Sequence, residues 1–230
     1  MSSADHWERE AERWAAWARA PKHDEYWHSS GPAFFELVPP PGRRTLDLGC
    51  GEGRVTRDLA ARGHEVVGID AAPTLIRLAR EADPRGDYHV CDAAALPFAD
   101  GSFDLVVAFN SLMDVDDMPG AVRETARVLE REGRLCACIT HPFRDGGRFL
   151  TRDESSPFII DRPYFGRKRF AATVAREGYE VTFKGWTYPL QAYTRALEES
   201  GLLIESLREP PDTPRLSNVP NFLLIRAAKA

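Results

Sequence analysis

The chain has 230 residues, 43% of them hydrophobic and 28% charged, and carries a formal net charge of -5. This length suits one α/β domain with an extensive core, and the mild acidity argues against a nucleic-acid partner, whose backbone needs a broad basic face. The charged start, MSSADHWEREAERW, lacks the apolar centre of a secretory signal, and no apolar run approaches the ~18 residues of a membrane span, so we expect a cytoplasmic protein without membrane contacts.

The N-terminal 41 residues are predicted to contain two helices. Over residues 5–19, alanines and three tryptophans recur at helical spacing, which predicts an amphipathic helix whose tryptophan stripe packs on another element. Residues 21–27 are expected to be irregular, and a second helix is expected near residues 32–38. The sequence PPPG at residues 39–42 ends this helix.

Between residues 42 and 140, short apolar runs alternate with helical patterns. The apolar runs are RTLDLG, HEVVGID, DYHVCD, FDLVVAF and GRLCACIT, and the helical segments are EGRVTRDLAARG, APTLIRLAREA and AVRETARVLERE. Near-continuous apolar strands that alternate with helices indicate βαβ units and a parallel sheet covered on both faces.

The alternation stops after residue 140. Residues 141–188 hold ten of the chain's aromatic side chains and more Lys and Arg than Asp and Glu, which we interpret as an insertion over the edge of the sheet. A helix near residues 190–200 and strands near 202–207 and 222–227 follow. We expect the last two strands to pair as an antiparallel hairpin at the sheet edge.

The four cysteines lie in or beside apolar, strand-like runs. They are Cys50, Cys91, Cys136 and Cys138, and no second pair or nearby histidine completes a tetrahedral zinc site. We interpret them as structural thiols, and disulfides are not expected in a reducing compartment.

The stretch LDLGCGEGRV places three glycines at the end of an apolar run, where a strand must turn tightly beside a closely approaching group. A phosphate loop requires Lys and then Ser or Thr after its last glycine, whereas Arg and Val follow here. A dinucleotide fingerprint requires its third glycine three residues after the second, whereas Gly49, Gly51 and Gly53 close one residue early. The glycines alone therefore leave the ligand open.

Three carboxylates stand at or near the ends of neighbouring predicted strands. Asp47 lies two residues before the first glycine, Asp70 ends the second strand, and Asp92 follows the third. The carboxyl ends of parallel strands share one edge of a sheet, where open α/β sheets bind ligands. Asp70 is suited to accept both hydroxyls of a ribose, and Asp47 is suited to support the loop or to face a cation. We therefore expect a ligand that carries a ribose and positive charge.

Four motifs occur in order between residues 44 and 140: LDLGCGEGR, VVGID, VCDAAALPFADGSFDLVVAFNSLMDVDD and RVLEREGRLCACI. With these motifs the chain resembles the class I S-adenosyl-L-methionine (SAM)-dependent methyltransferases, in particular the type 11 small-molecule group. The resemblance implies SAM as cofactor, S-adenosyl-L-homocysteine as product, and a Rossmann-like α/β fold with seven mostly parallel strands, helices on both faces and an antiparallel last strand. Residues 42–140 would form the SAM-binding core, and residues 189–230 would complete it in a single domain.

The resemblance also assigns roles along the glycine-rich loop and the first two strands. Gly49, Gly51 and Gly53 would bring their backbone alongside the methionine part of the cofactor, with Asp47 near its amino group. Asp70 would hold the ribose hydroxyls. For each acid, a helix cap or a turn residue is the alternative.

Further roles fall on the ends of the next strands. Ala71 would pack beside the adenine, Asp92 would accept from its amino group, and the Ala93 N–H would donate to a ring nitrogen. Phe109 and Asn110 would pass their backbone beneath the cofactor.

Residues 1–41 are interpreted as a helical lid over this cofactor. Tyr26 and Trp27 supply aromatic surface suited to covering a sulfonium, and Arg19 is suited to gripping a carboxylate. A surface helix followed by a loop is the alternative for this segment.

Methyl transfer from a sulfonium is an in-line displacement, so the enzyme mainly positions the acceptor and excludes water. If the acceptor is a hydroxyl or a protonated amine, a general base helps, and His141 in ITHPF is the candidate, with Asp145 to orient it. A histidine that caps the strand end is the alternative. A strongly nucleophilic acceptor would need no base.

A metal site is the alternative for three acids that follow the fourth strand. Asp114, Asp116 and Asp117 offer oxygen ligands suited to magnesium. Asp116 or Asp117 more simply caps the helix that begins near Pro119. We therefore predict no metal.

The aromatic insertion over residues 141–188 is interpreted as the acceptor chamber. Tyr164, Trp186 and Tyr188 are the candidate wall residues, and Arg144 is a candidate for receiving a carboxylate or phenolate. The alternative is that these aromatic residues bury the insertion's own core.

The sequence thus predicts an enzyme that transfers a methyl group from SAM to an oxygen or nitrogen of a small, aromatic or heteroaromatic metabolite. The alternative is a relative of the same fold that keeps the cofactor without using its methyl group, as a cyclase or a regulatory binding protein. A homodimer is compatible with the sequence, which does not determine the oligomeric state.

Overall fold

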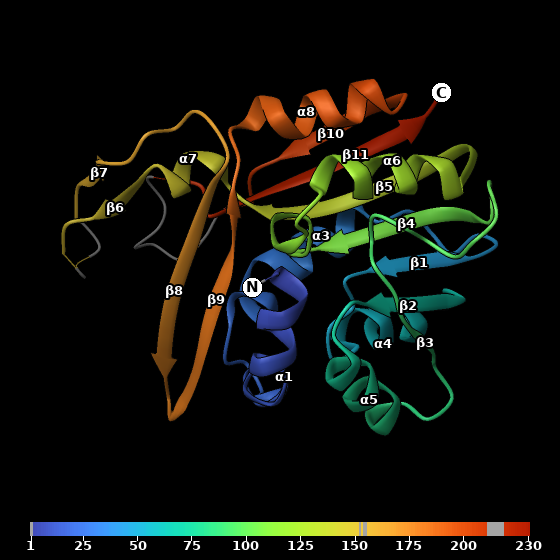
Figure 1. The fold of residues 1–230 in the computed structure, drawn as a ribbon, viewed down its shortest axis with the longest axis horizontal. Coiled ribbons are helices and arrows are strands. Elements are labelled where there is room, and N and C mark those ends of the chain that lie inside the picture. Colours follow the sequence, from blue (N-terminus) through green and yellow to red (C-terminus); the bar gives the residue numbers. More distant parts are fainter. Residues whose placement is uncertain (1, 152, 154–155, 211–218) are drawn as a thin grey trace.

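The structure is a computed structural model that describes residues 2–151, 153, 156–210 and 219–230. Its centre is a seven-stranded sheet with the strand order β10-β11-β5-β4-β1-β2-β3 (Figure 1). The strands are β1 (Thr45–Leu48), β2 (Val66–Asp70), β3 (Asp87–Val90), β4 (Phe103–Phe109), β5 (Leu129–Thr140), β10 (Leu202–Arg208) and β11 (Phe222–Lys229). Neighbouring strands pair in parallel except for β11, which is antiparallel to both β5 and β10. The predicted fold class and the terminal hairpin are confirmed.

Helices cover both faces of this sheet. They are α3 (Ser30–Leu37), α4 (Arg54–Ala61), α5 (Pro73–Ala82), α6 (Met118–Val128) and α8 (Leu190–Glu199). One face of the sheet packs on α6 and α8 in a core that includes Val106, Leu135 and Leu197. The other face packs on α3 and α4 in a core that includes Phe34 and Leu59. The apolar stripe of each helix thus meets near-continuous apolar strands, as parallel sheets require.

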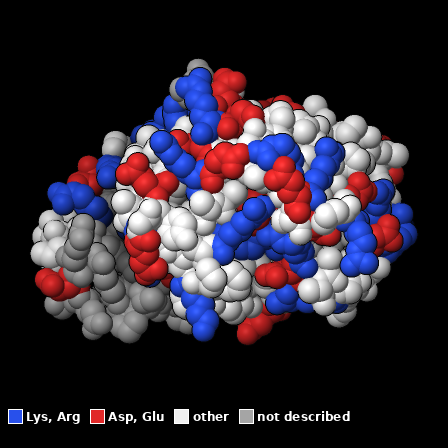
Figure 2. All heavy atoms as spheres, turned by 90° about the horizontal axis from the view of Figure 1, so that it is seen from below, with Lys and Arg blue, Asp and Glu red and all other residues white. Residues whose placement is uncertain are grey.

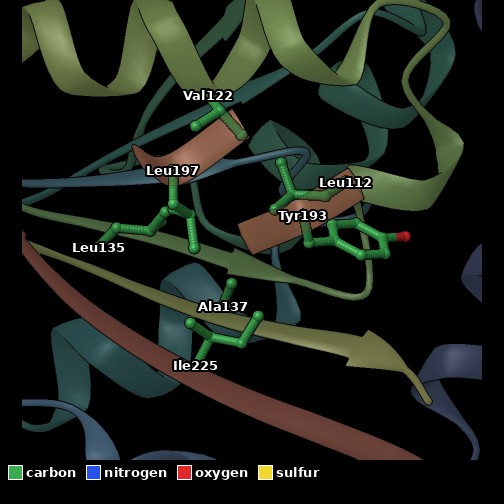
Figure 3. A pocket seen from close by; sticks show the side chains of 7 residues that line it. All are labelled: Leu112, Val122, Leu135, Ala137, Tyr193, Leu197 and Ile225. Atoms are coloured by element: carbon green, nitrogen blue, oxygen red, sulfur yellow. The ribbon is translucent and has the colours of Figure 1, made fainter. Parts of the chain in front are cut away.

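A small apolar cavity lies in the first of these cores, between α6, α8 and the sheet (Figure 3). Its volume is about 10 Å³, roughly the room of a single water molecule. It is lined by Leu112, Val122, Leu135, Ala137, Tyr193, Leu197 and Ile225. Because this lining is almost entirely aliphatic, the cavity is a packing void and not a ligand site.

The N-terminal helices lie at the carboxyl ends of the parallel strands (Figure 1). The first, α1 (Ser3–Arg19), begins with a capping box on Ser2. The segment predicted to be irregular, residues 21–27, contains the start of a one-turn helix, α2 (Glu25–His28), which is too short to leave an apolar period in the sequence. The helix α3 begins two residues earlier than predicted, because a proline in the first turn lacks only an N–H that has no helical partner.

The boundary between α6 and β5 lies close to the predicted end of the helix. The helix was expected from about Pro119 to Leu129, although the helical run AVRETARVLERE continues to residue 132; α6 ends at Val128 and β5 begins at Leu129. Glu132 has a positive φ of 64°, and the pairing of β4 with β5 shifts register between Phe103 and Leu105. The polar residues at this irregular start of the strand follow no alternating pattern, so the helical run continues over them.

The described residues between 141 and 188 lie outside the seven-stranded sheet. They form α7 (Pro142–Asp145) and two antiparallel hairpins, β6 (Gly147–Phe149) with β7 (Phe158–Ile160) and β8 (Lys168–Arg176) with β9 (Tyr179–Thr187). The β8–β9 hairpin lies beside α1 (Figure 1). The inserted segment and the N-terminal segment therefore meet at the carboxyl edge of the sheet.

The four cysteines are free thiols in the structure. Cys136 and Cys138 are buried in the core beneath α3 and α4, as expected for two residues on one face of a strand. Cys50 is also buried, and Cys91 is partly exposed. Their surroundings agree with the interpretation as structural thiols.

No helix within the described ranges is both long and apolar enough to cross a bilayer. On the face of the molecule shown in Figure 2, Lys and Arg lie interspersed with Asp and Glu. This mixture of signs is typical of a water-exposed surface.

Candidate functional site

The glycine-rich loop turns the chain from β1 into α4 at the carboxyl edge of the sheet. The Gly49 and Cys50 N–H groups both donate to the Ile69 carbonyl oxygen, at 2.9 and 2.8 Å, which ties the loop to β2. Gly49, Gly51 and Gly53 all have positive φ angles, between 57° and 86°. Only glycine adopts this backbone readily at three alternate positions, which explains why the sequence GCGEG is needed here.

The three glycines meet different neighbours. A Cβ atom at Gly49 would overlap the Ser111 side chain, and one at Gly53 would lie 2.8 Å from the Tyr88 hydroxyl. A Cβ at Gly51 would lie 3.0 Å from Nε1 of Trp14 in α1. Gly49 and Gly53 are therefore required by packing against β3 and the turn after β4, whereas Gly51 allows the Trp14 side chain of α1 to lie against the loop.

Asp47 is a fully buried carboxylate at the end of β1. Its Oδ2 accepts a hydrogen bond of 2.6 Å from Thr56 Oγ1 of α4. Burial raises the pKa of Asp47 to about 7; the hydrogen bond from Thr56 opposes this shift, and the nearby Asp70 adds to it. An acid whose charge is this costly favours a cationic ligand nearby.

Asp70 links the end of β2 to the glycine-rich loop. Its Oδ2 accepts from the Gly51 N–H and its Oδ1 accepts from the Ala72 N–H, both at 2.9 Å. Burial raises the pKa of Asp70, while these backbone hydrogen bonds oppose the shift. Each carboxylate oxygen keeps a second lone pair. The side chain is therefore held in place and can still accept two ribose hydroxyls.

The ends of β3 and β4 complete this edge. Asp92 Oδ1 accepts from the Ala94 N–H at 2.9 Å in a local turn, which is the alternative that the sequence left open, and its adenine role stays a prediction. Asn110 has a positive φ of 52° and its N–H donates to the Cys138 carbonyl. Ser111 Oγ donates to the Leu48 carbonyl at 2.5 Å, which fastens the turn after β4 to the strand beneath the glycine-rich loop.

Tyr26 and Trp27, predicted to cover the cofactor, have different surroundings. Tyr26 is buried against Phe109, its hydroxyl donates to Asp58, and the Arg54 guanidinium lies 3.9 Å from its ring centroid. Trp27 is 42% exposed. Tyr26 thus braces α4, and the cofactor contacts of both residues stay predictions.

The tryptophan stripe of α1 packs on β9. The rings of Trp7, Trp14 and Trp17 surround Phe183 with centroid distances of 6.3, 6.0 and 6.2 Å. Trp14, which sequence reasoning treated only as part of this stripe, is the α1 residue beside Gly51. The repeated tryptophan was the signal for docking, but nothing local in the sequence indicated what it docks on.

Arg19, predicted with the lid residues to grip a carboxylate, is engaged within the protein. Its Nε donates to Oε2 of the buried Glu52 at 2.8 Å. This contact fastens the end of α1 to the glycine-rich loop.

His141 caps α7. Its Nδ1 accepts from the Phe143 N–H at 3.1 Å, and its Nε2 lies 3.0 Å from Glu209 Oε1. Burial lowers the pKa of His141, and Glu209 opposes the shift. The capping alternative is therefore present in the structure, and both ring nitrogens are engaged. The role of His141 as a base stays a prediction.

The candidate acceptor residues divide into two groups. Trp186 Nε1 donates to Asp116 at 2.9 Å, and Tyr188 is buried with its ring 5.5 Å from that of Tyr193. Tyr164 Oη accepts from the N–H of Leu190, at 2.9 Å.

The second group is Arg144 in α7. Its guanidinium lies 5.3 Å from the Phe149 ring centroid and 5.6 Å from that of Phe158. Arg144 therefore packs against the β6–β7 hairpin, and its contact with an acceptor stays a prediction.

The three acids after β4 have separate environments. Asp117 Oδ1 accepts from the Gly120 N–H at 3.0 Å and caps α6, as predicted. Asp116 accepts from the N–H and hydroxyl of Ser3, at 2.9 and 2.8 Å. Among the residues that the structure describes, no group of three His, Cys, Asp or Glu side chains is arranged to hold a metal.

Comparison with known proteins places this geometry in a family. A family model described as "Methyltransferase domain" matches residues 46–137. The chain is 37% identical over 106 residues to a demethylmenaquinone methyltransferase of Tropheryma whipplei, covering 45% of this chain and 44% of the relative. It is 35% identical over 117 residues to a ubiquinone biosynthesis O-methyltransferase of Xanthomonas axonopodis pv. citri, covering 47% and 49%. These matches span less than half the length of the curated relatives.

A solved structure extends the likeness beyond the core. The S-adenosylmethionine-dependent methyltransferase of Mesorhizobium loti superposes with a TM-score of 0.71 at 25% identity, covering 89% of this chain and 98% of that one. The matched residues 46–137 include the glycine-rich loop, Asp70 and the ends of β3 and β4. Residues 46–137 therefore match the methyltransferase domain family, and the whole chain is similar in fold to a solved S-adenosylmethionine-dependent methyltransferase.

Proposed function

We propose that this protein transfers a methyl group from SAM to an oxygen or nitrogen of a small aromatic or heteroaromatic acceptor. The observation that carries the proposal is the hydrogen bond between Asp70 and the Gly51 N–H, because it joins the candidate ribose-binding acid to the loop glycine that faces Trp14 of α1. A nucleoside with an amino-acid arm fits this pair, with its ribose on the acid and its arm along the loop.

The residues of the site would act mainly by positioning. Asp70 would hold the ribose, the buried Asp47 would lie near the amino group, and Asp92 would face the adenine. Trp14 and Phe183 would exclude water at the side of α1 and β9. When bound, the cofactor supplies the electrophilic methyl group.

The acceptor class rests on the relatives and on the insertion. Two relatives are named for demethylmenaquinone and for O-methylation in ubiquinone biosynthesis, which favours a ring-bearing acceptor. Trp186 on β9 supplies an aromatic face. The Arg167 and Arg169 guanidiniums lie 3.4 and 4.0 Å from its ring centroid, so an acceptor ring would stack there in place of one of them. We expect the protein to be located in the cytoplasm.

Binding of S-adenosyl-L-homocysteine, measured by titration calorimetry, tests the cofactor site. The variant D70N should bind 5- to 150-fold more weakly, corresponding to about 1–3 kcal/mol for lost hydrogen bonds to a charged group. The matched control D117N changes an acid that caps α6 and should bind within about twofold of the wild type. Equal affinity of D70N and the wild type would contradict the ribose role.

A further inference from the structure

Asp114 is a carboxylate after β4 that does not cap α6, since Asp117 is the cap. It ends a short 3-10 turn, η1 (Leu112–Asp114), that directly follows β4. The Asp114 N–H donates to the Ser111 carbonyl at 2.9 Å, and Ser111 itself packs on Gly49. The Asp114 backbone is thus fastened to the residue that contacts the glycine-rich loop.

Gly185 of β9 lies directly against the Asp114 carboxylate. A Cβ atom at Gly185 would overlap Asp114 Oδ1 and would lie 2.8 Å from the Met113 carbonyl oxygen. The absence of a side chain at Gly185 therefore allows η1 and β9 to enclose the Asp114 side chain. Two residues earlier on β9, Phe183 contacts Trp14, which lies beside Gly51. Asp114 and the glycine-rich loop are thereby linked through Gly185, Phe183 and Trp14.

Asp114 differs from its two neighbouring acids in its hydrogen bonding. Asp116 and Asp117 each accept from backbone N–H groups. Within the part of the chain that the structure describes, neither a hydrogen bond nor a cationic side chain acts on the pKa of Asp114. A partly buried carboxylate without donors is costly to keep charged.

Two titratable groups act on Asp114 from the surrounding elements. Burial is the main cause that raises the pKa of Asp114 well above the ordinary range, and the charge of Asp70 on β2 adds to the shift. From α8, Tyr193 lies within reach of the Asp114 charge, which adds to the rise that burial causes in the pKa of Tyr193. Asp114 is therefore suited to hold a proton at a higher pH than an ordinary aspartate does.

We propose that Asp114 accepts the proton of the atom that is methylated, and hence that the acceptor presents an O–H or N–H group at η1. The inference rests on the proposed function. The acceptor atom forms its new bond to the methyl carbon, and the bond from that carbon to sulfur breaks with its electron pair going to sulfur. The O–H or N–H bond breaks, its electron pair stays on the acceptor atom, and the proton goes to a carboxylate oxygen of Asp114, which later releases it to water.

The protonation of Asp114 can be measured without turnover. In protein labelled with ¹³C at the aspartate carboxyl, the resonance that D114N removes should titrate well above the ~4 of an ordinary aspartate. The control D117N should leave this resonance unchanged. Because the charged carboxylate destabilises the folded state, D114N should also have a higher unfolding temperature than the wild type at pH 8, with the difference closing in acid.

Turnover is measured with labelled SAM against a panel of phenols, catechols and aromatic amines. D114N should lower kcat by at least about 100-fold, the scale of a lost general base, and flatten the acid side of the pH profile. Its affinity for S-adenosyl-L-homocysteine should stay within about threefold of the wild type. D114E should restore part of the loss, and D117N should have no effect on kcat.

The outcomes separate this inference from the proposed function. If D114N retains kcat within about threefold, or if the Asp114 resonance titrates like that of an ordinary aspartate, the proton-accepting role is overturned. If S-adenosyl-L-homocysteine binds but no phenol or amine is methylated, both the acceptor class and the role of Asp114 fail. If S-adenosyl-L-homocysteine does not bind to the wild type, the proposed function itself is wrong.

Discussion

At the scale of single residues, Asp47 shows how strongly the site depends on one donor. The carboxylate is fully buried and its side-chain donor is Thr56 Oγ1, at 2.6 Å. The variant T56V removes this donor, so we expect its free energy of unfolding at pH 8 to fall by about 1–3 kcal/mol, the cost of an unsatisfied buried group. Denaturant titration measures this change. T56S keeps a hydroxyl and should lose less, and equal losses in the two variants would contradict the explanation.

The same residue predicts how stability varies with pH. Because the pKa of Asp47 is raised to about 7 in the folded chain, the folded state holds a proton that the unfolded state has already released above pH ~4. The free energy of unfolding should therefore fall as pH rises from about 4 to 7. In D47N, denaturant titrations across this range should give a smaller slope. An unchanged slope would show that Asp47 ionises at its ordinary pH.

Residue chemistry was partly predictable from the sequence. The need for glycine at positions 49, 51 and 53 followed from the turn, and the structure bears out their positive φ angles. The sequence could not show that Gly49 and Gly53 serve packing while Gly51 faces α1, because that difference depends on Ser111, Tyr88 and Trp14. Gly185 gave no local signal, since its role appears only when β9 meets η1.

At the scale of elements, α1 is the piece that joins the core to the insertion. Asp116 fastens the first turn of α1 by accepting from Ser3, and it also accepts from Trp186 of β9. One turn further along α1, the Glu8 carboxylate accepts from the N–H and the hydroxyl of Thr74 in the first turn of α5, at 2.9 and 2.6 Å. The position of α1 therefore depends on contacts with three separate segments.

Removing the first of these contacts should loosen α1. In D116N, the backbone amides of α1 should exchange with deuterium roughly 5- to 30-fold faster, which corresponds to a loss of about 1–2 kcal/mol of local stability. Hydrogen exchange read by mass spectrometry measures this. D117N, which uncaps α6, serves as the matched control and should leave α1 unchanged. If α1 exchanges equally fast in the wild type and in D116N, then Asp116 does not hold it.

The elements that the sequence failed to predict share a cause. Helix α2 spans four residues, and the start of β5 contains an irregular pairing, so neither leaves a periodic pattern. The docking of α1 on β9 joins residues 176 positions apart, as between His6 and Thr182. Local patterns could predict that the tryptophan stripe packs on another element, but not which element it meets.

At the scale of the whole molecule, the order of strands and helices was predictable because each buried strand reads as an apolar run. The sheet places the ends of β1, β2, β3 and β4 along one edge, as parallel strands must. Onto that edge the chain brings its first helix and its inserted β8–β9 hairpin (Figure 1). The molecule is therefore organised around the edge at which the candidate site lies.

A crystal structure of the chain with S-adenosyl-L-homocysteine tests the central claim most directly. We expect the ribose hydroxyls within hydrogen-bonding distance of Asp70, the amino-acid arm along Gly51, and Trp14 displaced from its present contact with that glycine. A ligand bound at a different edge of the sheet, or one whose ribose lies away from Asp70, would contradict the account.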